Sequence, residues 1–313
     1  MAAGLIWVTA RRERRSGWAW SRSEVSRMPA PELHDLRAGT SILLPPVWAQ
    51  VFLPVARLVC CGLQGLGVPT KIVEYTEDVD TPWTIVVGWH VFRSPPLLPG
   101  DYVIYQLEPL VQPLWQARLQ EKRQLFDQAA TIWDYSPMNL PAFGRHDVVC
   151  VPLGYEPSMR EVTLQPGPPD HDVLFYGFLS PRRRLVLERL INLCSVSTEP
   201  RWGTHLAPAL ARARIVLNIH QYDGPTPLEQ ARTSYVMNQH VLLVTEYSED
   251  LLFPEIVAAP FDELTETVLQ LLHDPTERRR RHRAALEAYM SVTMADRLQA
   301  ALNQKSPKSS SPT

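Results

Sequence analysis

Short apolar, β-branched runs alternate with longer amphipathic segments along most of this chain, and this alternation constrains the fold more than any other feature. Buried strands of a parallel sheet have such runs because helices cover both faces of the sheet. The pattern occurs twice, over residues 40–155 and again over 170–303. Between the two series lies QPGPP (165–169), which can continue neither a helix nor a central strand. The sequence therefore predicts an α/β protein with two Rossmann-like domains.

The expected elements follow from the two series. Strands are predicted over residues 41–44, 70–74, 83–87, 102–106, 131–135 and 147–151, and then over 172–176, 214–219 and 241–245. Helices are predicted over 49–66, 114–129, 181–193, 207–213, 227–238, 261–273, 275–289 and 293–302. The pair Ser136-Pro137 is typical of a helix start, with serine as the N-cap and proline at the first helical position.

The two ends of the chain do not fit this pattern. Residues 1–39 are expected to be an irregular extension, within which Met28 is a second plausible start, and 304–313 (QKSPKSSSPT) a disordered tail. No run reaches the 18 or so apolar residues that a membrane span needs. An arginine-rich stretch follows the apolar N-terminus, which reverses the order of a secretory signal, so a cytoplasmic protein is expected.

Charge and cysteine content narrow the possible partners. A net charge of −2 gives no overall field that would recruit nucleic acid. The basic run 278–283 (RRRRHR) is interpreted as a solvated helical face, or alternatively as a patch for anionic lipid or an acidic partner. We therefore expect no nucleic-acid partner and at most peripheral membrane contact. The four cysteines have neither zinc-site nor CxxC spacing and are expected to be free thiols.

The most informative residues follow the strands of the second series, because ligands of open α/β sheets bind at the carboxyl ends of strands. After the strand at 172–176, Gly177 allows a sharp turn, and Arg182 and Arg183 follow at a helix N-terminus. Free N–H groups and guanidinium groups both favour a phosphate there. The alternative is that these arginines are only a solvated helix start.

A polar loop follows the strand at 214–219. His220 and Tyr222 lie in this loop, and Glu229 and Arg232 lie three residues apart on one face of the next helix. A carboxylate in this place could accept the hydroxyls of a ribose or a sugar; an ordinary surface salt bridge is the alternative. Glu246 ends the next strand and is either a further ligand or a plain loop acid.

Candidate catalytic groups come from the first series. His90 follows the strand at 83–87, and Glu108 follows the strand at 102–106. Either could act in acid–base catalysis, although a lone histidine is more often structural. Asp134 and Ser136 lie at the next strand end and are expected to line the cleft.

Several motifs together resemble the group-1 / CgeB-like glycosyltransferases of the GT-B fold. They are YGFLSPRRR (176–184), RIVLNIHQYDGPTPLEQAR (214–232) and VLLVTE (241–246), with WDYSPMNL (133–140), VPLGYEP (151–157) and YQLEPL (105–110) in the N-terminal half. The resemblance implies that residues 170–303 bind a nucleotide-sugar donor, with Asn218 among the donor residues, and that residues 40–155 form the acceptor side. It implies two Rossmann-like domains facing across a cleft.

The expected activity is sugar transfer from a nucleoside diphosphate sugar to an unknown acceptor, without a cofactor. Arginines and helix dipoles could carry the charge of a leaving diphosphate, so the site is expected to work without a metal ion. The E-x7-E pattern of some members is absent, since Met237 stands eight residues after Glu229. Two alternatives therefore stay open: a catalytically inactive GT-B scaffold that binds a nucleotide-sugar or a protein, and a nucleotide-sugar epimerase.

Overall fold

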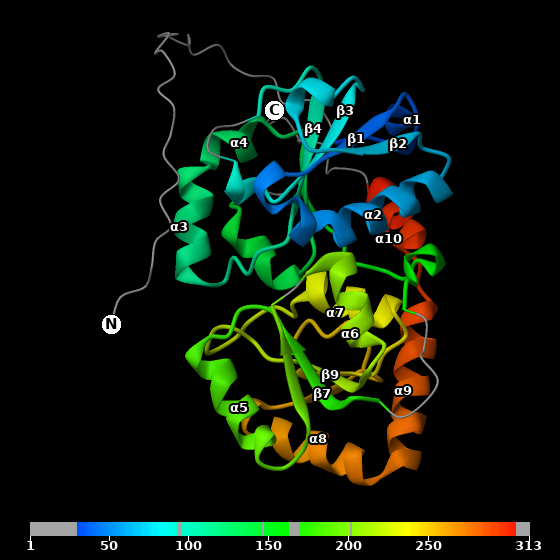
Figure 1. Ribbon diagram of the computed structural model, residues 1–313. Coiled ribbons are helices and arrows are strands. Elements are labelled where there is room, and N and C mark those ends of the chain that lie inside the picture. Colours follow the sequence, from blue (N-terminus) through cyan, green and yellow to red (C-terminus); the bar gives the residue numbers. More distant parts are fainter. Residues whose placement is uncertain (1–29, 93–95, 146, 163–168, 201, 305–313) are drawn as a thin grey trace.

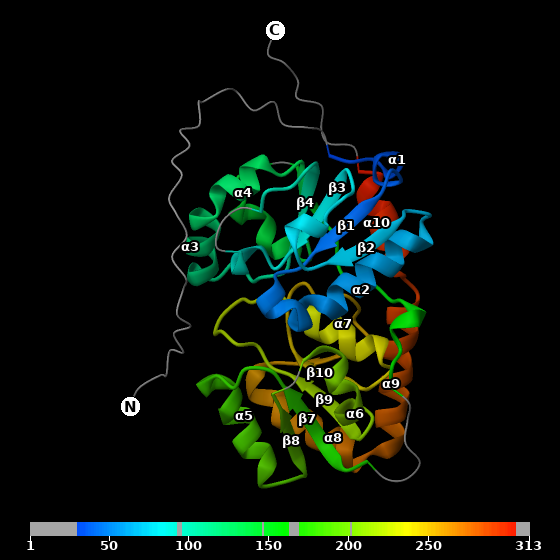
Figure 2. The ribbon, with the colours of Figure 1, turned by 45° about the horizontal axis from the view of Figure 1, so that its top comes forward.

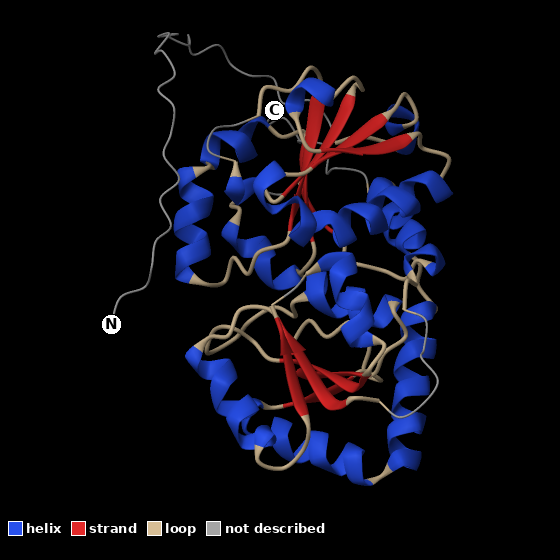
Figure 3. Cartoon of the chain, in the orientation of Figure 1, coloured by secondary structure: helices blue, strands red, loops and turns tan. Residues whose placement is uncertain are grey.

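The computed structural model describes residues 30–304, except 93–95, 146, 163–168 and 201. The chain forms two parallel sheets, one above the other, each with helices packed around it (Figures 1 and 3). Most of the expected extension at 1–39, and the expected tail beyond Gln304, lie outside the described residues.

The first sheet has six strands in the order β2-β1-β3-β4-β5-β6, all parallel. The strands are β1 (Thr40–Leu43), β2 (Thr70–Val73), β3 (Trp83–Val87), β4 (Asp101–Gln106), β5 (Thr131–Asp134) and β6 (Val148–Cys150). All six were predicted to within one or two residues. The chain reverses direction across the sheet between β1 and β3, and in open α/β sheets such a switch point opens a crevice at the carboxyl ends of its strands.

Helices of the N-terminal half are α1 (Leu33–Leu36), α2 (Ala49–Gly65), α3 (Pro113–Glu121) and α4 (Arg123–Gln128). The single helix predicted over 114–129 is thus two helices, interrupted at Lys122, whose ammonium group donates to the Phe92 carbonyl at 2.7 Å. The helix start predicted at Ser136 is a 3-10 helix, Pro137–Ala142, and the serine hydroxyl accepts from the Met138 amide at 3.2 Å.

The second sheet has five parallel strands in the order β11-β10-β9-β7-β8. The strands are β7 (His171–Tyr176), β8 (Val196–Glu199), β9 (Ala213–Asn218), β10 (Leu243–Glu246) and β11 (Val257–Ala259). The strands β8 and β11 were not predicted. Three of the four residues of β8 are polar, and β11 has only three residues, so neither carries the longer apolar run that indicates a buried strand. The switch point of this sheet lies between β7 and β9.

The helices of the C-terminal half are α5 (Pro181–Ile191), α6 (Ala207–Leu210), α7 (Gln230–Asn238), α8 (Leu264–His273), α9 (Pro275–Met290) and α10 (Met294–Leu302). Asp274 caps α9 by accepting from the amides of Thr276 and Glu277, at 2.9 Å each. Asp274 and Pro275 thus begin a helix, as predicted.

The last helix, α10, returns to the N-terminal half and packs on α2 (Figure 1). Gly62 of α2 is the point of closest approach, because a Cβ there would lie 2.8 Å from the Leu298 side chain. From the sequence, this helix was expected to belong to the C-terminal domain, because it follows that domain directly along the chain. Its apolar face is instead buried against the N-terminal domain, so the chain connects the two domains twice.

Helix α7 lies between the two domains, below α2 in Figures 1 and 2. It is buried along its length although many of its side chains are polar. Gln230 accepts from the Leu153 amide at 2.9 Å and donates to the Tyr135 carbonyl at 2.9 Å. Gln239 accepts from the Glu161 amide at 2.7 Å. These buried polar groups fix the domains against each other, because an unpaired partner would cost about 1–3 kcal/mol.

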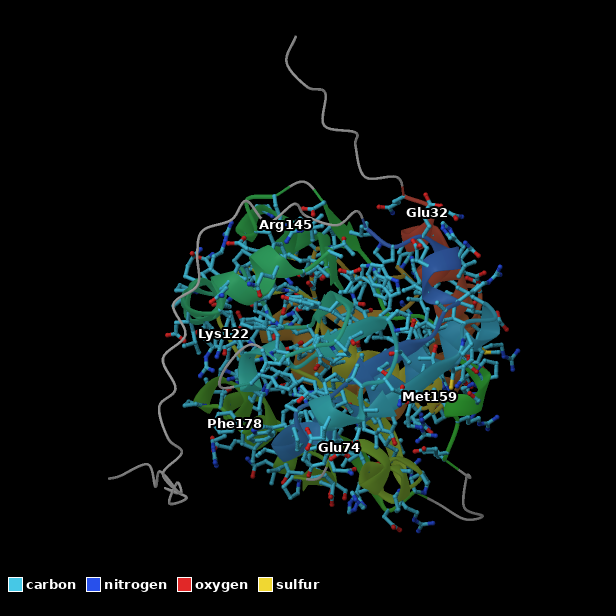
Figure 4. The ribbon with its side chains drawn as sticks, turned by 90° about the horizontal axis from the view of Figure 1, so that it is seen from above. Glu32, Glu74, Lys122, Arg145, Met159 and Phe178 are labelled. Atoms are coloured by element: carbon cyan, nitrogen blue, oxygen red, sulfur yellow. The ribbon has the colours of Figure 1, made fainter. Side chains whose placement is uncertain are left out.

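The segment Pro46–Gly65, which contains α2, is long and apolar enough to cross a membrane by length and composition alone. No segment of this kind was expected from the sequence. In the structure 56% of its apolar window is buried, and α2 packs against α7 and α10 as a core helix does. In the view from above, Met159 lies on the opposite side of the molecule from Lys122 and Phe178 (Figure 4).

Candidate active site between the two domains

A cavity of about 700 Å³ lies between the domains. Its walls come from the carboxyl ends of strands in both sheets: His90 follows β3, Glu108 follows β4, Tyr176 ends β7 and Tyr222 follows β9. The first half of α2 and the start of α7 complete the walls. The switch points of the two sheets therefore face each other across one cavity, which is where open α/β sheets bind their ligands.

Arg183 is a cavity residue and is almost completely buried. It extends from the first turn of α5, its Nε donates to the Ile219 carbonyl at 2.8 Å, and its Nη1 donates to the Phe178 carbonyl at 2.9 Å. Burial, together with the charge of Arg232, lowers the pKa of Arg183 to about 9, so the guanidinium is still charged at neutral pH. The carbonyl contacts hold this charge at the cavity wall.

Arg232 brings a second guanidinium group to the same wall. Its Nη1 donates to Asn218 Oδ1 at 3.1 Å, and its guanidinium carbon lies 5.3 Å and 5.7 Å from the ring centres of Tyr176 and Trp202. Its Nε is buried without a hydrogen-bond partner among the described residues. Two guanidinium groups that are almost fully buried at one wall favour an anion there.

Gly177 makes room for this arrangement. Its φ of +109° is one that residues with a side chain rarely adopt, and a Cβ there would lie 2.6 Å from Nη2 of Arg232. The glycine predicted to allow a turn therefore also allows the guanidinium of Arg232 to approach the backbone.

Glu229 lies directly before α7 and lines the cavity. Its carboxylate accepts from Asn218 Nδ2 at 2.9 Å and lies 2.8 Å from Nδ1 of His220. Burial alone would raise its pKa, but His220, Arg232 and Arg183 together lower the pKa of Glu229 to about 2. The carboxylate is therefore ionised, and Glu229 and Arg232, which the sequence placed on one face, do lie in one cluster.

His220 is buried beside Glu229 and is not part of the cavity wall among the described residues. Its Nε2 lies 3.1 Å from the Tyr247 carbonyl. Burial alone would lower its pKa, but Glu229, Glu246 and the Tyr247 carbonyl together raise it. His220 and Asn218 thus hold Glu229 from behind rather than face a ligand.

Arg182 and Glu246 form an ion pair with each other and do not line the cavity. Nη1 and Nη2 of Arg182 donate to the two Glu246 oxygens at 2.6 and 2.5 Å, and Nε donates to Asp223 at 2.8 Å. The guanidinium also lies over the Phe261 ring at 3.9 Å. Neither residue is among the cavity residues, so the expected phosphate and ligand contacts of these two side chains are replaced by an ion pair that holds the loop after β9.

On the opposite wall, Nδ1 of His90 lies 3.5 Å from Oε1 of Glu108. Burial raises the pKa of Glu108 to about 8, and burial with the nearby charge of Arg118 lowers that of His90 to about 4. Both groups are therefore uncharged at neutral pH. A carboxyl group with such a pKa is a stronger base, once ionised, than an ordinary glutamate. The sequence indicated each of these side chains as a separate acid–base candidate, and the structure places them side by side.

The expectation that Asp134 and Ser136 line the cleft is wrong for the described cavity. Tyr135, the residue between them, forms the wall. Asp134 is fully buried and accepts from Gln106, Asn139 and the Ser136 amide at 2.8–3.0 Å. Successive side chains of an extended chain point in opposite directions, so exposing the tyrosine to the cavity turns its two neighbours away.

Tyr222 lines the cavity and joins the two walls. Its hydroxyl accepts from Nε1 of Trp115 in α3 at 3.2 Å. Sequence reasoning did not find Trp115 or Trp202, which packs on Arg232. Neither follows a strand directly, and tryptophan in a helix or loop carries no motif that distinguishes a cavity wall from a core.

Known proteins resemble this chain in two ways, by sequence and by fold. No family model matches the chain. A curated relative, the uncharacterized protein L140 of Acanthamoeba polyphaga mimivirus, is 30% identical over 162 residues, which are 47% of this chain and 53% of L140. The chain thus spans about half the length of this curated relative.

Solved structures resemble the chain over most of its length. BGT of phage T4 in complex with UDP and Mn²⁺ covers 85% of this chain and all of its own, with 12% identity and a TM-score of 0.55. AviGT4, a glycosyltransferase involved in avilamycin A biosynthesis, covers 85% of this chain and 97% of its own, with 15% identity and a TM-score of 0.53.

A third neighbour, HepE of Anabaena in complex with UDP and glucose, covers 86% of this chain and 95% of its own, with 12% identity and a TM-score of 0.51. At these identities the likeness concerns the fold. With two parallel sheets whose carboxyl ends face one cavity, this chain has the α/β two-domain GT-B fold.

Proposed function

We propose that this protein is a glycosyltransferase that moves a sugar from a nucleoside diphosphate sugar to a hydroxyl acceptor. The observation that carries the proposal is the arrangement of the cavity, where the buried guanidinium groups of Arg183 and Arg232 face the His90–Glu108 pair. The fold neighbours bound to UDP, T4 BGT and HepE, make a uridine diphosphate sugar the first donor to test.

In this proposal the diphosphate lies against Arg183 and Arg232. Cleavage of the bond between the anomeric carbon and the diphosphate leaves negative charge on the diphosphate, and two fixed guanidinium groups stabilise that charge without reorganising. The Glu229 carboxylate, held by Asn218 and His220, accepts hydroxyls of the donor.

On the acceptor side, ionised Glu108 takes the proton of the attacking hydroxyl. The acceptor oxygen forms the new bond to the anomeric carbon, and the electron pair of the old bond leaves with the diphosphate. His90 lies beside Glu108 at the same wall, with 3.5 Å between Nδ1 and Oε1.

We also propose that the reaction proceeds without a metal ion, since the two arginines supply the positive charge that a leaving diphosphate requires. The test is donor cleavage in EDTA against cleavage with added Mn²⁺ or Mg²⁺. Equal rates would support the proposal, and loss of activity in EDTA that a metal ion restores would overturn it.

We propose that the donor-binding C-terminal half belongs to the group-1 / CgeB-like glycosyltransferases. The motifs around 176–184 and 214–246 support this proposal. An inactive scaffold would bind the same donor without releasing nucleotide. Measuring binding and release together therefore separates an enzyme from a scaffold.

The deciding experiment is isothermal titration with UDP, GDP and UDP-glucose, followed by an assay for release of free UDP. Arg183→Met and Arg232→Met should each weaken UDP binding about ten- to hundredfold, because a hydrogen bond to a charged group contributes about 1.5–3 kcal/mol. Arg184→Met is the matched control, since Arg184 is exposed on the same helix and is not a cavity residue. Absence of binding by every nucleotide tested would refute the proposed function.

A further inference from the structure

The N-terminal domain presents a largely apolar wall to the cavity. Its members come from α2, from the strand ends and from α3: Trp48, Phe52, Val91, Leu107, Pro109 and Trp115. This wall lies opposite the arginines of the C-terminal domain. It is the surface left for the acceptor when the donor lies against Arg183 and Arg232.

Few polar groups interrupt this wall. Among the described residues that line it, the polar side chains of the N-terminal domain are those of His90, Glu108, Arg118 and Tyr135. Arg118 lies over the Trp115 ring at 5.5 Å. A sugar acceptor carries several hydroxyls, and each one buried without a partner costs free energy. Once His90 and Glu108 engage the reacting hydroxyl, little remains on this wall to satisfy the others.

The apolar surface continues out of the cavity. Trp48 lines the cavity and is 52% exposed, and Val47 beside it is 84% exposed. Large apolar side chains that extend from a cavity to the surface are typical of a binding surface for an apolar molecule. The acceptor can therefore be longer than the cavity is deep.

We infer that the acceptor is an uncharged, largely apolar hydroxyl compound, such as a phenol or a long-chain alcohol, bound against Trp48, Phe52 and Trp115. This inference rests on the proposed function and specifies its second substrate. The single hydroxyl lies at the His90–Glu108 pair, its oxygen bonds to the anomeric carbon, its proton passes to Glu108, and the nucleoside diphosphate leaves with the electron pair of the broken bond.

The test is a competition among acceptors with UDP-glucose, or with whichever donor the release assay selects. The probes are 4-methylumbelliferone and 1-octanol as apolar hydroxyl compounds, and glucose, maltose and a short DNA duplex as polar ones, with products identified by mass spectrometry. We expect kcat/KM for at least one apolar probe to exceed that for every polar probe by a hundredfold or more. Transfer to a polar probe at equal or higher kcat/KM would overturn the inference.

A pair of variants locates the acceptor. Trp48→Ala should raise KM for the apolar probe about tenfold or more. Tyr75→Ala is the matched control, because Tyr75 is also aromatic and 52% exposed but does not line the cavity. An unchanged acceptor KM in Trp48→Ala would overturn the placement.

The two proposals fail in different ways. If UDP binds and is released from UDP-glucose but only the polar probes accept the sugar, the acceptor inference fails and the proposed function stands. If the donor is cleaved but neither apolar probe accepts the sugar, the inference fails as well. If no nucleotide binds, both proposals fail.

Discussion

Nδ1 of His220 lies 2.8 Å from Oε2 of Glu229, while Nε2 of the same ring lies 3.1 Å from the Tyr247 carbonyl. A carbonyl oxygen only accepts, so Nε2 carries a proton. Because Glu229 has a pKa of about 2, it is ionised and also only accepts, so Nδ1 carries a second proton. The imidazolium thus holds a cavity carboxylate in place from behind, in a position that the sequence did not reveal.

The first prediction concerns stability and pH. A histidine whose folded pKa is raised stabilises the fold below its unfolded pKa of about 6.5, and that contribution is lost as the pH rises through the folded value. His220→Gln should cost about 1–3 kcal/mol of unfolding free energy at pH 6. Urea denaturation between pH 5 and pH 9 measures both proteins. The gap between them should narrow toward high pH; a gap that widens would contradict the assigned imidazolium.

The second prediction concerns the pH dependence of transfer. Burial raises the pKa of Glu108 to about 8, and only the ionised carboxylate accepts a proton, so kcat/KM should rise about tenfold per pH unit below pH 8 and level off above it. Glu108→Gln should lower the rate by about 10²–10⁴ and remove the pH dependence without changing UDP affinity. A profile that is already flat from pH 5 would identify His90, whose pKa is lowered to about 4, as the base instead.

The third prediction concerns the contact between Gly177 and Arg232. Gly177→Ala adds a methyl group 2.6 Å from Nη2 of Arg232 and should weaken UDP binding at least tenfold by displacing the guanidinium. Gly39→Ala is the control, since Gly39 has a similar φ of +122° and its Cβ would meet Thr81, outside the cavity. Both variants should lose about 1–3 kcal/mol of stability from backbone strain. If titration calorimetry gave the Gly177→Ala and Gly39→Ala variants equal UDP affinities, a specific role for Gly177 would be refuted.

The fourth prediction concerns the pair of Arg182 and Glu246. Glu246→Ala leaves Nη2 of Arg182 and the His220 amide without an acceptor, while Arg182 keeps its bonds to Asp223 and to the His220 carbonyl, and should cost about 1–3 kcal/mol. The double variant with Arg182→Met should cost less than the sum of the single changes, because the two groups interact directly. Chemical denaturation of the four proteins gives the coupling free energy. Additive costs would show that the pair does not hold the loop.

The sequence predicted the fold with good accuracy where helices cover both faces of a strand. The interior strands β1, β3, β4 and β5 of the first sheet, and β7, β9 and β10 of the second, were all predicted, because a strand covered on both faces has little room for polar side chains. Of the edge strands, β2 and β6 were also predicted, whereas β8, in which three of the four residues are polar, and the three-residue β11 were missed.

The candidate site divides in a similar way. Strand ends located His90, Glu108, Gly177 and Arg183 near the cavity, since the carboxyl ends of parallel strands meet at one edge of a sheet. The sequence could not show that two adjacent arginines contact different partners. Arg183 points into the cavity and Arg182 pairs with Glu246, because neighbouring positions on a helix are rotated by about 100°.

The sequence by itself determined the two-sheet α/β architecture and the edge of each sheet at which chemistry could occur. These follow from local periodicity, which each segment carries on its own. Only the tertiary structure decided which polar side chains face the cavity and which are neutralised behind it, and that α10 returns to pack on α2. It also set the uncharged state of the His90–Glu108 pair at neutral pH. Burial and pairing arise from contacts between distant segments, and no single segment contains them.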